Sequence, residues 1–303
     1  MTTVDSQLKK AAIIIPKTHI VLQEFLALMA GIKPVINCGI SEEDIQLIRS
    51  NFPNLYIVSG EQTLWHRRIE ISSISYNKLL AQRTLNAFCG KGDTPDVMGK
   101  LLGYPKCCTE SWVKYIHADQ QHNAPLVTYE AYKTAYKCSP FANNLLNFSS
   151  RVGDNEVKDF EKCGPLNMRL SIPFHYFQFI SHVPCRYDCQ ESIKMGKEID
   201  FLMKRYTPDI ERVVKATLSK PILFFDLFKL AVLDGRVKNK AVYYQKISLP
   251  FFLLDKPIFK ALKSGNKLTA NDKQVEIFKD DRSLFVYKKQ NIMDGFILDF
   301  GEK

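Results

Sequence analysis

Apolar residues in the first quarter of the chain fall into short runs separated by stretches with helical spacing. Runs of four or five apolar residues predict strands, and apolar residues at i, i+3 and i+4 predict helices. Ser41 is followed by three acidic residues, and together they predict a helix start. A serine side chain can accept a hydrogen bond from a free N–H group there, and acidic side chains interact favourably with the partial positive charge. The predicted strands are Ala11–Ile15, Val35–Cys38 and Leu55–Val58, with helices at residues 20–30 and 41–52 between them. This order predicts a short parallel sheet in a small α/β unit.

The pattern changes twice further along the chain. From Tyr76 to about Tyr206 the signals are mostly helical, and helices are predicted at Tyr76–Phe88 and Pro95–Leu102. Beyond Pro208 one more helix precedes short β-rich runs that are separated by turn residues. That helix is Ile210–Leu218, the runs are Val242–Tyr244, Val275–Phe278, Leu284–Tyr287 and Phe296–Leu298, and a hairpin tip is expected at Asp280–Arg282.

The predicted fold class is therefore mixed α+β, in three domains. Residues 1–75 form the small α/β unit, residues 76–207 form a helical core that carries the cysteine clusters, and residues 208–303 form a mostly β C-terminal module. No Gly-x-Gly-x-x-Gly phosphate loop follows a predicted strand, so no dinucleotide site is expected.

Composition narrows the class of protein and the compartment in which it is expected. A chain of 303 residues with 46% hydrophobic residues can bury a full core. Eight cysteines are too sparse for a small disulfide scaffold, and the polar N-terminus does not resemble a signal peptide. We therefore expect a cytoplasmic protein, where paired thiols more often bind metal or carry redox chemistry. No run approaches the roughly 18 apolar residues of a membrane span, so no membrane association is expected.

The formal net charge of +10 suggests a positive face that can attract nucleic acid, an anionic metabolite or an acidic partner. The lysines look spread along the chain rather than clustered. This favours a solvated lysine-rich surface over a dedicated binding face.

Two cysteine clusters about eighty residues apart carry the chemistry of the sequence. The first is Gly-Tyr-Pro-Lys-Cys-Cys at residues 103–108, and the second is His-Val-Pro-Cys-Arg-Tyr-Asp-Cys at residues 182–189. Four thiols and one imidazole are the ligand set of zinc or of an iron–sulfur cluster. The candidate metal ligands are Cys107, Cys108, Cys185, Cys189 and His182.

Both clusters are expected at helix starts. Pro105 suits the first turn of a helix that contains Cys107 and Cys108, and Asp188 is the expected N-cap of a helix whose first turn contains Cys189. Helix N-termini carry partial positive charge, which stabilises thiolates and thiolate-bound metals. The side chains of adjacent cysteines diverge, so we expect one of Cys107 and Cys108 to bind the metal. Three or four ligands then leave either a closed zinc site or a cluster with one position open to substrate.

Other interpretations of the same residues remain open. Free cysteine is often a buried core residue, which is the expected role of Cys38, Cys89, Cys138 and Cys163. A redox-active thiol pair is an alternative for the clusters themselves. Arginines near the cysteines can hold a carboxylate or a phosphate, and the candidate substrate-binding residues are Arg151, Arg169 and Arg186.

The two motifs also resemble those of an uncharacterised prokaryotic family of unknown function. Its members carry a Gly-Tyr-Pro-x-Cys-Cys segment and a His-x-Pro-Cys-x-x-x-Cys-x-x-Ser segment, and the resemblance covers residues 95–245. Where members usually have serine after Pro-Cys, this chain has Arg186. The resemblance implies that the four cysteines and His182 belong to one site, and it supplies no reaction.

The leading functional hypothesis is a cytosolic metal- or iron–sulfur-binding protein that acts as an enzyme. It would act on a small or anionic substrate at an open coordination position. One alternative is a nucleic-acid-binding protein in which zinc only staples the fold, and another is a thiol-redox protein. The substrate and the oligomeric state are not predicted.

Overall fold

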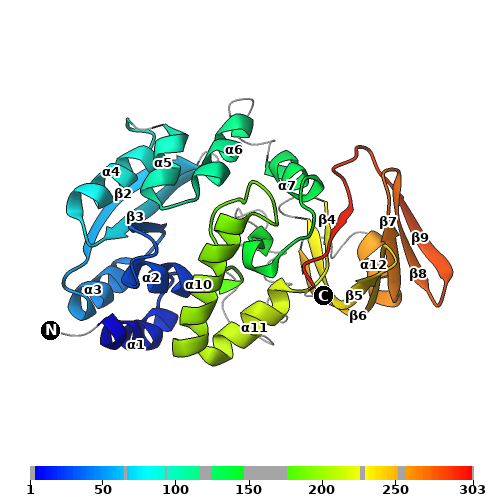
Figure 1. The fold of residues 1–303 in the computed structure, drawn as a ribbon, viewed down its shortest axis with the longest axis horizontal. Coiled ribbons are helices and arrows are strands. Elements are labelled where there is room, and N and C mark those ends of the chain that lie inside the picture. The colour runs from blue at the N-terminus through cyan, green and yellow to red at the C-terminus, as the bar shows by residue number, and fades with distance from the viewer. Residues whose placement is uncertain are drawn as a thin grey trace. The chain divides into compact units, whose positions relative to one another are not determined.

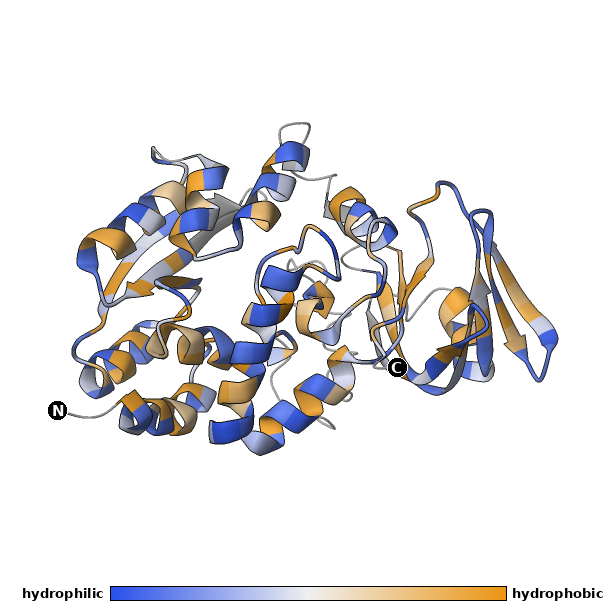
Figure 2. Ribbon diagram, viewed as in Figure 1, coloured by the Kyte–Doolittle hydropathy of each residue, from blue (hydrophilic) through white to orange (hydrophobic). Residues whose placement is uncertain are grey.

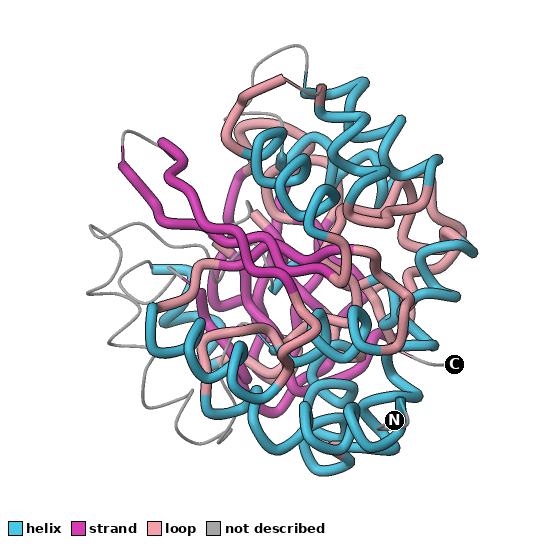
Figure 3. The backbone as a smooth tube through the Cα atoms, turned by 90° about the vertical axis from the view of Figure 1, so that its left-hand side faces the viewer, coloured by secondary structure: helices cyan, strands magenta, loops and turns pink. Residues whose placement is uncertain are grey.

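The computed structural model describes residues 4–64, 67–92, 94–116, 124–146, 176–225, 229–251 and 257–301. Helices and strands are both abundant, and the strands form one small sheet and one larger antiparallel sheet (Figures 1 and 3). The predicted mixed α+β class is therefore confirmed. The chain divides into two compact units, residues 1–114 with 194–209 and residues 115–193 with 210–303. The three predicted domains stay a prediction.

The first unit contains a three-stranded sheet, and its helices precede, separate and follow the strands in the sequence. Its strands are β1 (Val35–Cys38), β2 (Tyr56–Leu64) and β3 (Arg67–Ser75). Its helices are α1 (Val4–Ile14), the short 3-10 helix η1 (Ile15–Lys17), α2 (Leu22–Met29), α3 (Glu42–Asn51), α4 (Lys78–Phe88) and α5 (Pro95–Leu101). Helices α6 (Lys106–Ile116) and α10 (Gln190–Tyr206) each contribute most of their residues to this unit.

The predicted parallel sheet is wrong, for a reason that the topology makes clear. The strand order is β1-β3-β2, and β3 runs antiparallel to both of its neighbours. β1 and β2 therefore do point the same way, as a strand–helix–strand unit requires, but they do not touch. The sequence analysis missed β3, which follows β2 as a hairpin and fills the place between the two parallel strands.

The first predicted strand, Ala11–Ile15, is also wrong, because these residues end α1 and form η1. Leu8, Ala11 and Ile15 are buried, and their spacing of three and four residues places them on one face of a helix. A five-residue apolar run cannot by itself distinguish a strand from the buried stripe of a helix.

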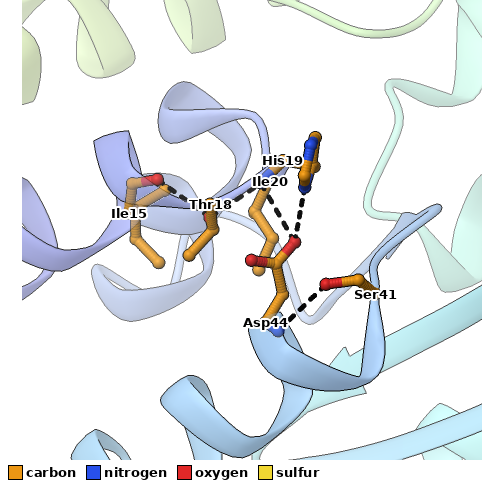
Figure 4. Close-up of polar contacts among 6 residues, drawn as sticks. All are labelled: Ile15, Thr18, His19, Ile20, Ser41 and Asp44. Atoms are coloured by element: carbon orange, nitrogen blue, oxygen red, sulfur yellow. Dashed lines mark hydrogen bonds and ion pairs between the residues drawn. The ribbon is translucent and has the colours of Figure 1, made fainter.

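The start of α3 is held as the sequence predicts, and it is also tied to the segment before α2 (Figure 4). The Ser41 hydroxyl accepts a hydrogen bond from the backbone N–H of Asp44 at 3.2 Å. The Asp44 carboxylate in turn accepts from the backbone N–H of His19 at 3.1 Å and lies 2.9 Å from the His19 ring Nδ1. The Thr18 hydroxyl accepts from the N–H of Ile20, which completes the connection.

The second unit is built on a seven-stranded antiparallel sheet with the order β10-β4-β5-β6-β7-β8-β9. The strands are β4 (Ile222–Phe224), β5 (Leu230–Lys238), β6 (Ala241–Phe251), β7 (Lys267–Ala270), β8 (Gln274–Lys279), β9 (Arg282–Lys288) and β10 (Phe296–Leu298). Its helices are α7 (Ala124–Lys133), the 3-10 helix η2 (Pro140–Ala142), α11 (Pro208–Leu218) and α12 (Pro257–Ser264).

The predicted C-terminal strands are confirmed, and so is the hairpin between β8 and β9. Asp280 and Asp281 form its tip with φ of 48° and 65°, a conformation that aspartate tolerates better than most residues. The predicted helix Ile210–Leu218 is confirmed within α11, along which hydrophobic and hydrophilic residues alternate (Figure 2). The core of the sheet includes Val242, Leu268 and Ile277, and α12 adds the buried side chains of Ile258 and Leu262.

Replacement of Ser41 tests the helix cap. Ser41→Ala removes the acceptor for the Asp44 N–H, so the free energy of unfolding is expected to fall by about 1 kcal/mol, measured by urea denaturation. Ser50→Ala is the matched control, because Ser50 lies near the other end of the same helix and its exposed hydroxyl donates to the Leu47 carbonyl and accepts from the Asn51 side chain. An equal loss in both variants would contradict the role of Ser41.

Candidate metal centre

Cys107 and Cys108 lie in the first turn of α6, as the sequence predicts. The helix begins at Lys106, and the Pro105 carbonyl accepts hydrogen bonds from the N–H groups of Cys108 and Thr109, each at 3.0 Å. Cys107 is exposed and Cys108 is buried, and their sulfurs are 3.9 Å apart. The free N–H groups of this first turn favour thiolate over thiol.

The approach to α6 contains two glycines that allow very close packing, Gly99 within α5 and Gly103 in the turn that follows it. Gly103 has φ of +74°, and a Cβ there would lie 2.7 Å from the Pro34 Cδ. A Cβ on Gly99 would lie 2.5 Å from the hydroxyl oxygen of Thr109, the residue that follows the cysteine pair. Neither position can hold a larger residue without a shift in the segment that carries Cys107 and Cys108.

A buried ion pair lies beside the same turn. Lys33 contacts Glu24, and both residues are almost completely buried. The Lys33 Nζ is also 5.0 Å from the centre of the Tyr104 ring. Burial acts to lower the pKa of Lys33, but the charge of Glu24 together with Tyr104 outweighs it and raises that pKa, so the lysine stays charged. The sequence analysis missed this pair, since a single lysine and glutamate nine residues apart give no recognisable pattern.

The second cluster lies in the loop that leads into α10. The Cys189 carbonyl accepts from the N–H of Ile193 at 2.9 Å, and the Cys189 N–H donates to the Arg186 carbonyl at 3.0 Å. Since α10 starts at Gln190, Cys189 is the residue at its N-cap. Cys189 is buried and Cys185 is half-buried.

Asp188 is not the N-cap that the sequence predicts. Its carboxylate accepts two hydrogen bonds from the Arg186 guanidinium, both at 2.8 Å, and a third from the backbone N–H of Tyr136 at 2.9 Å. The hydrogen bond from Arg186 is the main cause that lowers the pKa of Asp188. Arg186 therefore shapes the loop between Cys185 and Cys189, and its predicted contact with substrate stays a prediction.

Tyr187 anchors the loop inside the second unit. Its side chain is fully buried, and its ring packs edge-on against Phe300 with centroids 5.3 Å apart. Its backbone N–H donates to the Ala131 carbonyl at 3.2 Å, and its carbonyl accepts from the Ser139 N–H at 2.9 Å. Contacts on both sides of the peptide hold this segment in one conformation.

His182 is buried, but the structure does not bring it into the group of cysteines. Its Nε2 lies 2.8 Å from the hydroxyl oxygen of Ser192, which lies in the first turn of α10. Its backbone carbonyl accepts from the Asn144 side chain at 2.8 Å. The predicted role of His182 as a ligand stays a prediction, and the observed contact connects it to the helix that follows Cys189.

Cys107, Cys108, Cys185 and Cys189 come together in the structure, with all four sulfurs within 4.8 Å of one another. The chain therefore contains a cluster of four cysteines that can hold a metal ion. A tetrahedral zinc ion with Zn–S distances of about 2.3 Å holds its sulfurs about 3.8 Å apart, close to the 3.9 Å between Cys107 and Cys108. The donor set fits such an ion, and it includes both members of the adjacent pair.

The remaining predicted residues lie elsewhere. Burial and the nearby carboxylates of Glu24 and Asp44 raise the pKa of Cys38 to about 12, and burial is also the main cause that raises the pKa of Cys138 to about 12. Both stay protonated near neutral pH, which suits the predicted core role. The described cysteines that are left out of the group of four are Cys38, Cys89 and Cys138, whereas Cys163, Arg151 and Arg169 fall outside the described residues.

Comparison of the chain with protein-family models, with curated proteins and with solved structures gave no match. The chemistry of the site therefore rests on its own residues. Among the residues that the structure describes, no helix is long and apolar enough to cross a membrane.

The close approach at Gly103 predicts a measurable cost for a single methyl group. Gly103→Ala is expected to lower the free energy of unfolding by about 2 kcal/mol or more, because alanine disfavours this φ and its Cβ collides with Pro34. Gly31→Ala is the control, since Gly31 has the same kind of φ, +75°, but open space around the position of a Cβ. It should cost about 1 kcal/mol. Equal losses in urea denaturation would show that packing against Pro34 contributes nothing.

Proposed function

We propose that this chain is a metal-binding protein in which Cys107, Cys108, Cys185 and Cys189 hold one zinc ion through four thiolates. The observation that supports the proposal is the separation of the sulfurs, all within 4.8 Å of one another. Side chains from two helix starts about eighty residues apart meet in this group, and neither hydrophobic packing nor hydrogen bonding needs four sulfurs in one place.

The same separation favours one ion over an iron–sulfur cube. In a four-iron cluster each cysteine binds a different iron at an outer corner, so the sulfurs lie farther apart than they do around a single metal. Among single ions, zinc and iron both accept four thiolates, and zinc forms the more common closed site in proteins. The thiols must remain reduced to bind it, which a compartment such as the cytosol provides.

A closed site of this kind contributes to folding rather than to a reaction. Four ligands complete a tetrahedral shell, and the binding free energy becomes part of the stability of the folded chain. Membership of the prokaryotic family with Gly-Tyr-Pro-x-Cys-Cys and His-x-Pro-Cys motifs is part of this proposal. It accounts for both motifs as parts of one metal site.

The exposure of Cys107 supports a second candidate function, metal-dependent catalysis. Cys108 and Cys189 are buried, whereas Cys107 is exposed to solvent. A ligand at the surface can leave the metal and open a position for a small or anionic substrate, where the ion then acts as a Lewis acid. In this case the ion keeps three thiolates, and Cys107 is the one that exchanges.

Metal analysis of protein purified under anaerobic conditions tests the proposal directly. We expect a colourless protein with one zinc per chain and no acid-labile sulfide, measured by elemental analysis. Because bound thiolates must be deprotonated, zinc should be released as the pH falls, and a chelator should lower the melting temperature. A brown protein with iron and sulfide, or a metal-free protein with a disulfide between Cys185 and Cys189, contradicts the zinc site.

Single substitutions identify the ligands. Cys108→Ser and Cys189→Ser should lower zinc affinity by more than about 100-fold in a competition with a chromophoric chelator. Cys89→Ser is the matched control, because Cys89 ends α4 and lies outside the group of four, and it should bind zinc as the native chain does. His182→Gln separates the two ligand sets, since it abolishes binding only if the imidazole coordinates the metal.

Cys107→Ser distinguishes the two candidate functions. A structural site loses affinity in this variant as much as in Cys108→Ser. A catalytic site with an exchangeable ligand retains one zinc per chain, and its bound cobalt analogue changes its visible spectrum when small thiols or carboxylates are added.

A further inference from the structure

The positive charge of the chain is concentrated in the C-terminal β module, contrary to the even spread expected from the sequence. Residues 229–289 contain 14 lysines and arginines and 6 acidic residues, a net charge of +8 out of +10 for the whole chain. This segment covers β5 to β9 and α12. Lysines that serve only to solvate the surface need not be concentrated in one segment. The module is therefore the candidate region for binding a polyanion.

One face of this sheet carries a row of alternating basic and aromatic side chains. The cross-strand pairing places Arg236 of β5 beside Tyr243 of β6, Tyr243 beside Lys267 of β7, and Lys267 beside Phe278 of β8. Residues paired in this way point to the same face of a sheet. The Lys267 Nζ lies 5.7 Å from the ring centre of Tyr243 and 5.1 Å from that of Phe278.

The next residues along the strands show that this row is on the outer face. Val242, Leu268 and Ile277 are each one residue away from the row, pair with one another across β6, β7 and β8, and are fully buried. The neighbouring Tyr244 belongs to the same core and donates from its hydroxyl to the carbonyl of Leu262 on α12. Tyr243, by contrast, is 41% exposed, and the Lys267 Nζ lies over its ring.

A groove with a volume of about 880 Å³ begins at this row. Arg236 and Tyr243 line it on the sheet, whereas Lys263 lines it from the end of α12, Asn266 from the segment that follows, and Lys279 from the end of β8. Two of its lining residues are glycines that allow a close approach of neighbouring atoms, because a Cβ on Gly235 would lie 2.1 Å from the Tyr243 carbonyl oxygen and one on Gly265 would lie 2.7 Å from Ile277.

Three cationic side chains around the groove form no ion pair with a described carboxylate. Asp234 is shared between Lys220 and Lys246 at 3.6 and 3.5 Å, and Asp281 is paired with Lys267 at 2.6 Å. Asp280 accepts a hydrogen bond from the Asn266 side chain. Among the described residues no carboxylate forms an ion pair with Arg236, Lys263 or Lys279, whose side chains are exposed.

We propose that this groove binds a segment of single-stranded nucleic acid, with a base stacked on Tyr243 and phosphates held by Arg236, Lys263 and Lys279. Single strands present flat bases and a regular line of negative charge together, and an exposed aromatic ring between unpaired cations matches both features. A double helix hides the faces of its bases, and a small phosphorylated molecule needs neither a surface row across four strands nor a charge of +8.

Fluorescence anisotropy of the full-length, metal-loaded protein with labelled oligouridine and oligothymidine of about 12 nucleotides tests this site. The native chain should bind at low salt, and log K should fall linearly with log salt concentration. Tyr243→Ala should weaken binding about tenfold, whereas Tyr243→Phe should bind as the native chain does, because stacking needs the ring and not the hydroxyl.

Charge variants supply the second measurement. Lys263→Ala and Lys279→Ala should each weaken binding and each reduce the salt slope by about 0.7, as expected for the loss of one phosphate contact with a single strand. Lys273→Ala is the matched control, because Lys273 lies in the same module, in the turn at the opposite end of β8, and is outside the groove. It should leave both the affinity and the slope unchanged, and circular dichroism should show all variants folded.

Several outcomes overturn the proposal. The first is no binding at low salt, and the second is an equal loss in Lys263→Ala, Lys279→Ala and Lys273→Ala, which would indicate a diffuse electrostatic effect. The third is native affinity in Tyr243→Ala. Tighter binding to vesicles that contain phosphatidylserine than to either oligonucleotide, with the same losses in the variants, would identify an anionic membrane surface as the ligand instead.

Discussion

Four thiol groups within 4.8 Å of one another set the main constraint on this structure. If all four ionise without a metal, each pair of unit charges about 4 Å apart repels by a few kcal/mol near a protein surface. The chain must therefore either keep the thiols protonated or bind a cation among them. A divalent ion removes the conflict, and the helix starts that contain or follow these cysteines lower the cost further, since free N–H groups at a helix start favour negative charge.

Contacts around each pair of cysteines fix the backbone segment that carries that pair. On one side, glycines at positions 99 and 103 and the buried contact of Lys33 with Glu24 fix the approach to α6. On the other side, the buried ring of Tyr187 and the contact of Arg186 with Asp188 fix the loop into α10. A pair of ligands whose own backbone segment is already fixed loses less conformational entropy if a metal binds, which raises affinity.

Motifs and local patterns in the sequence were enough to predict that the four cysteines come together. They also predicted the helix that contains Cys107 and Cys108, the cap at Ser41 and the C-terminal strands. The strand predicted at Ala11–Ile15 failed because a short apolar run does not distinguish a strand from a helix face, whereas other failures depended on contacts between distant segments. The place of β3 between β1 and β2 includes its pairing with β1, which no local pattern encodes, and one of the three hydrogen bonds that the Asp188 carboxylate accepts comes from the Tyr136 N–H, 52 residues away. The basic groove was overlooked for the same reason, since Arg236, Tyr243 and Lys279 become neighbours only when the sheet forms.

The strand order of the small sheet has a consequence for how the protein is made. β1 and β2 leave the ribosome before β3, yet neither has its partner strand in this sheet until Arg67–Ser75 has been synthesised. During that interval their backbone N–H and carbonyl groups are exposed edges, which are the parts of a nascent chain most prone to pair with other molecules. The pairing of β3 with β1 and β2 therefore ends a vulnerable period of synthesis, and mutations in β3 that slow this pairing should reduce yield more than they reduce the stability of the finished protein.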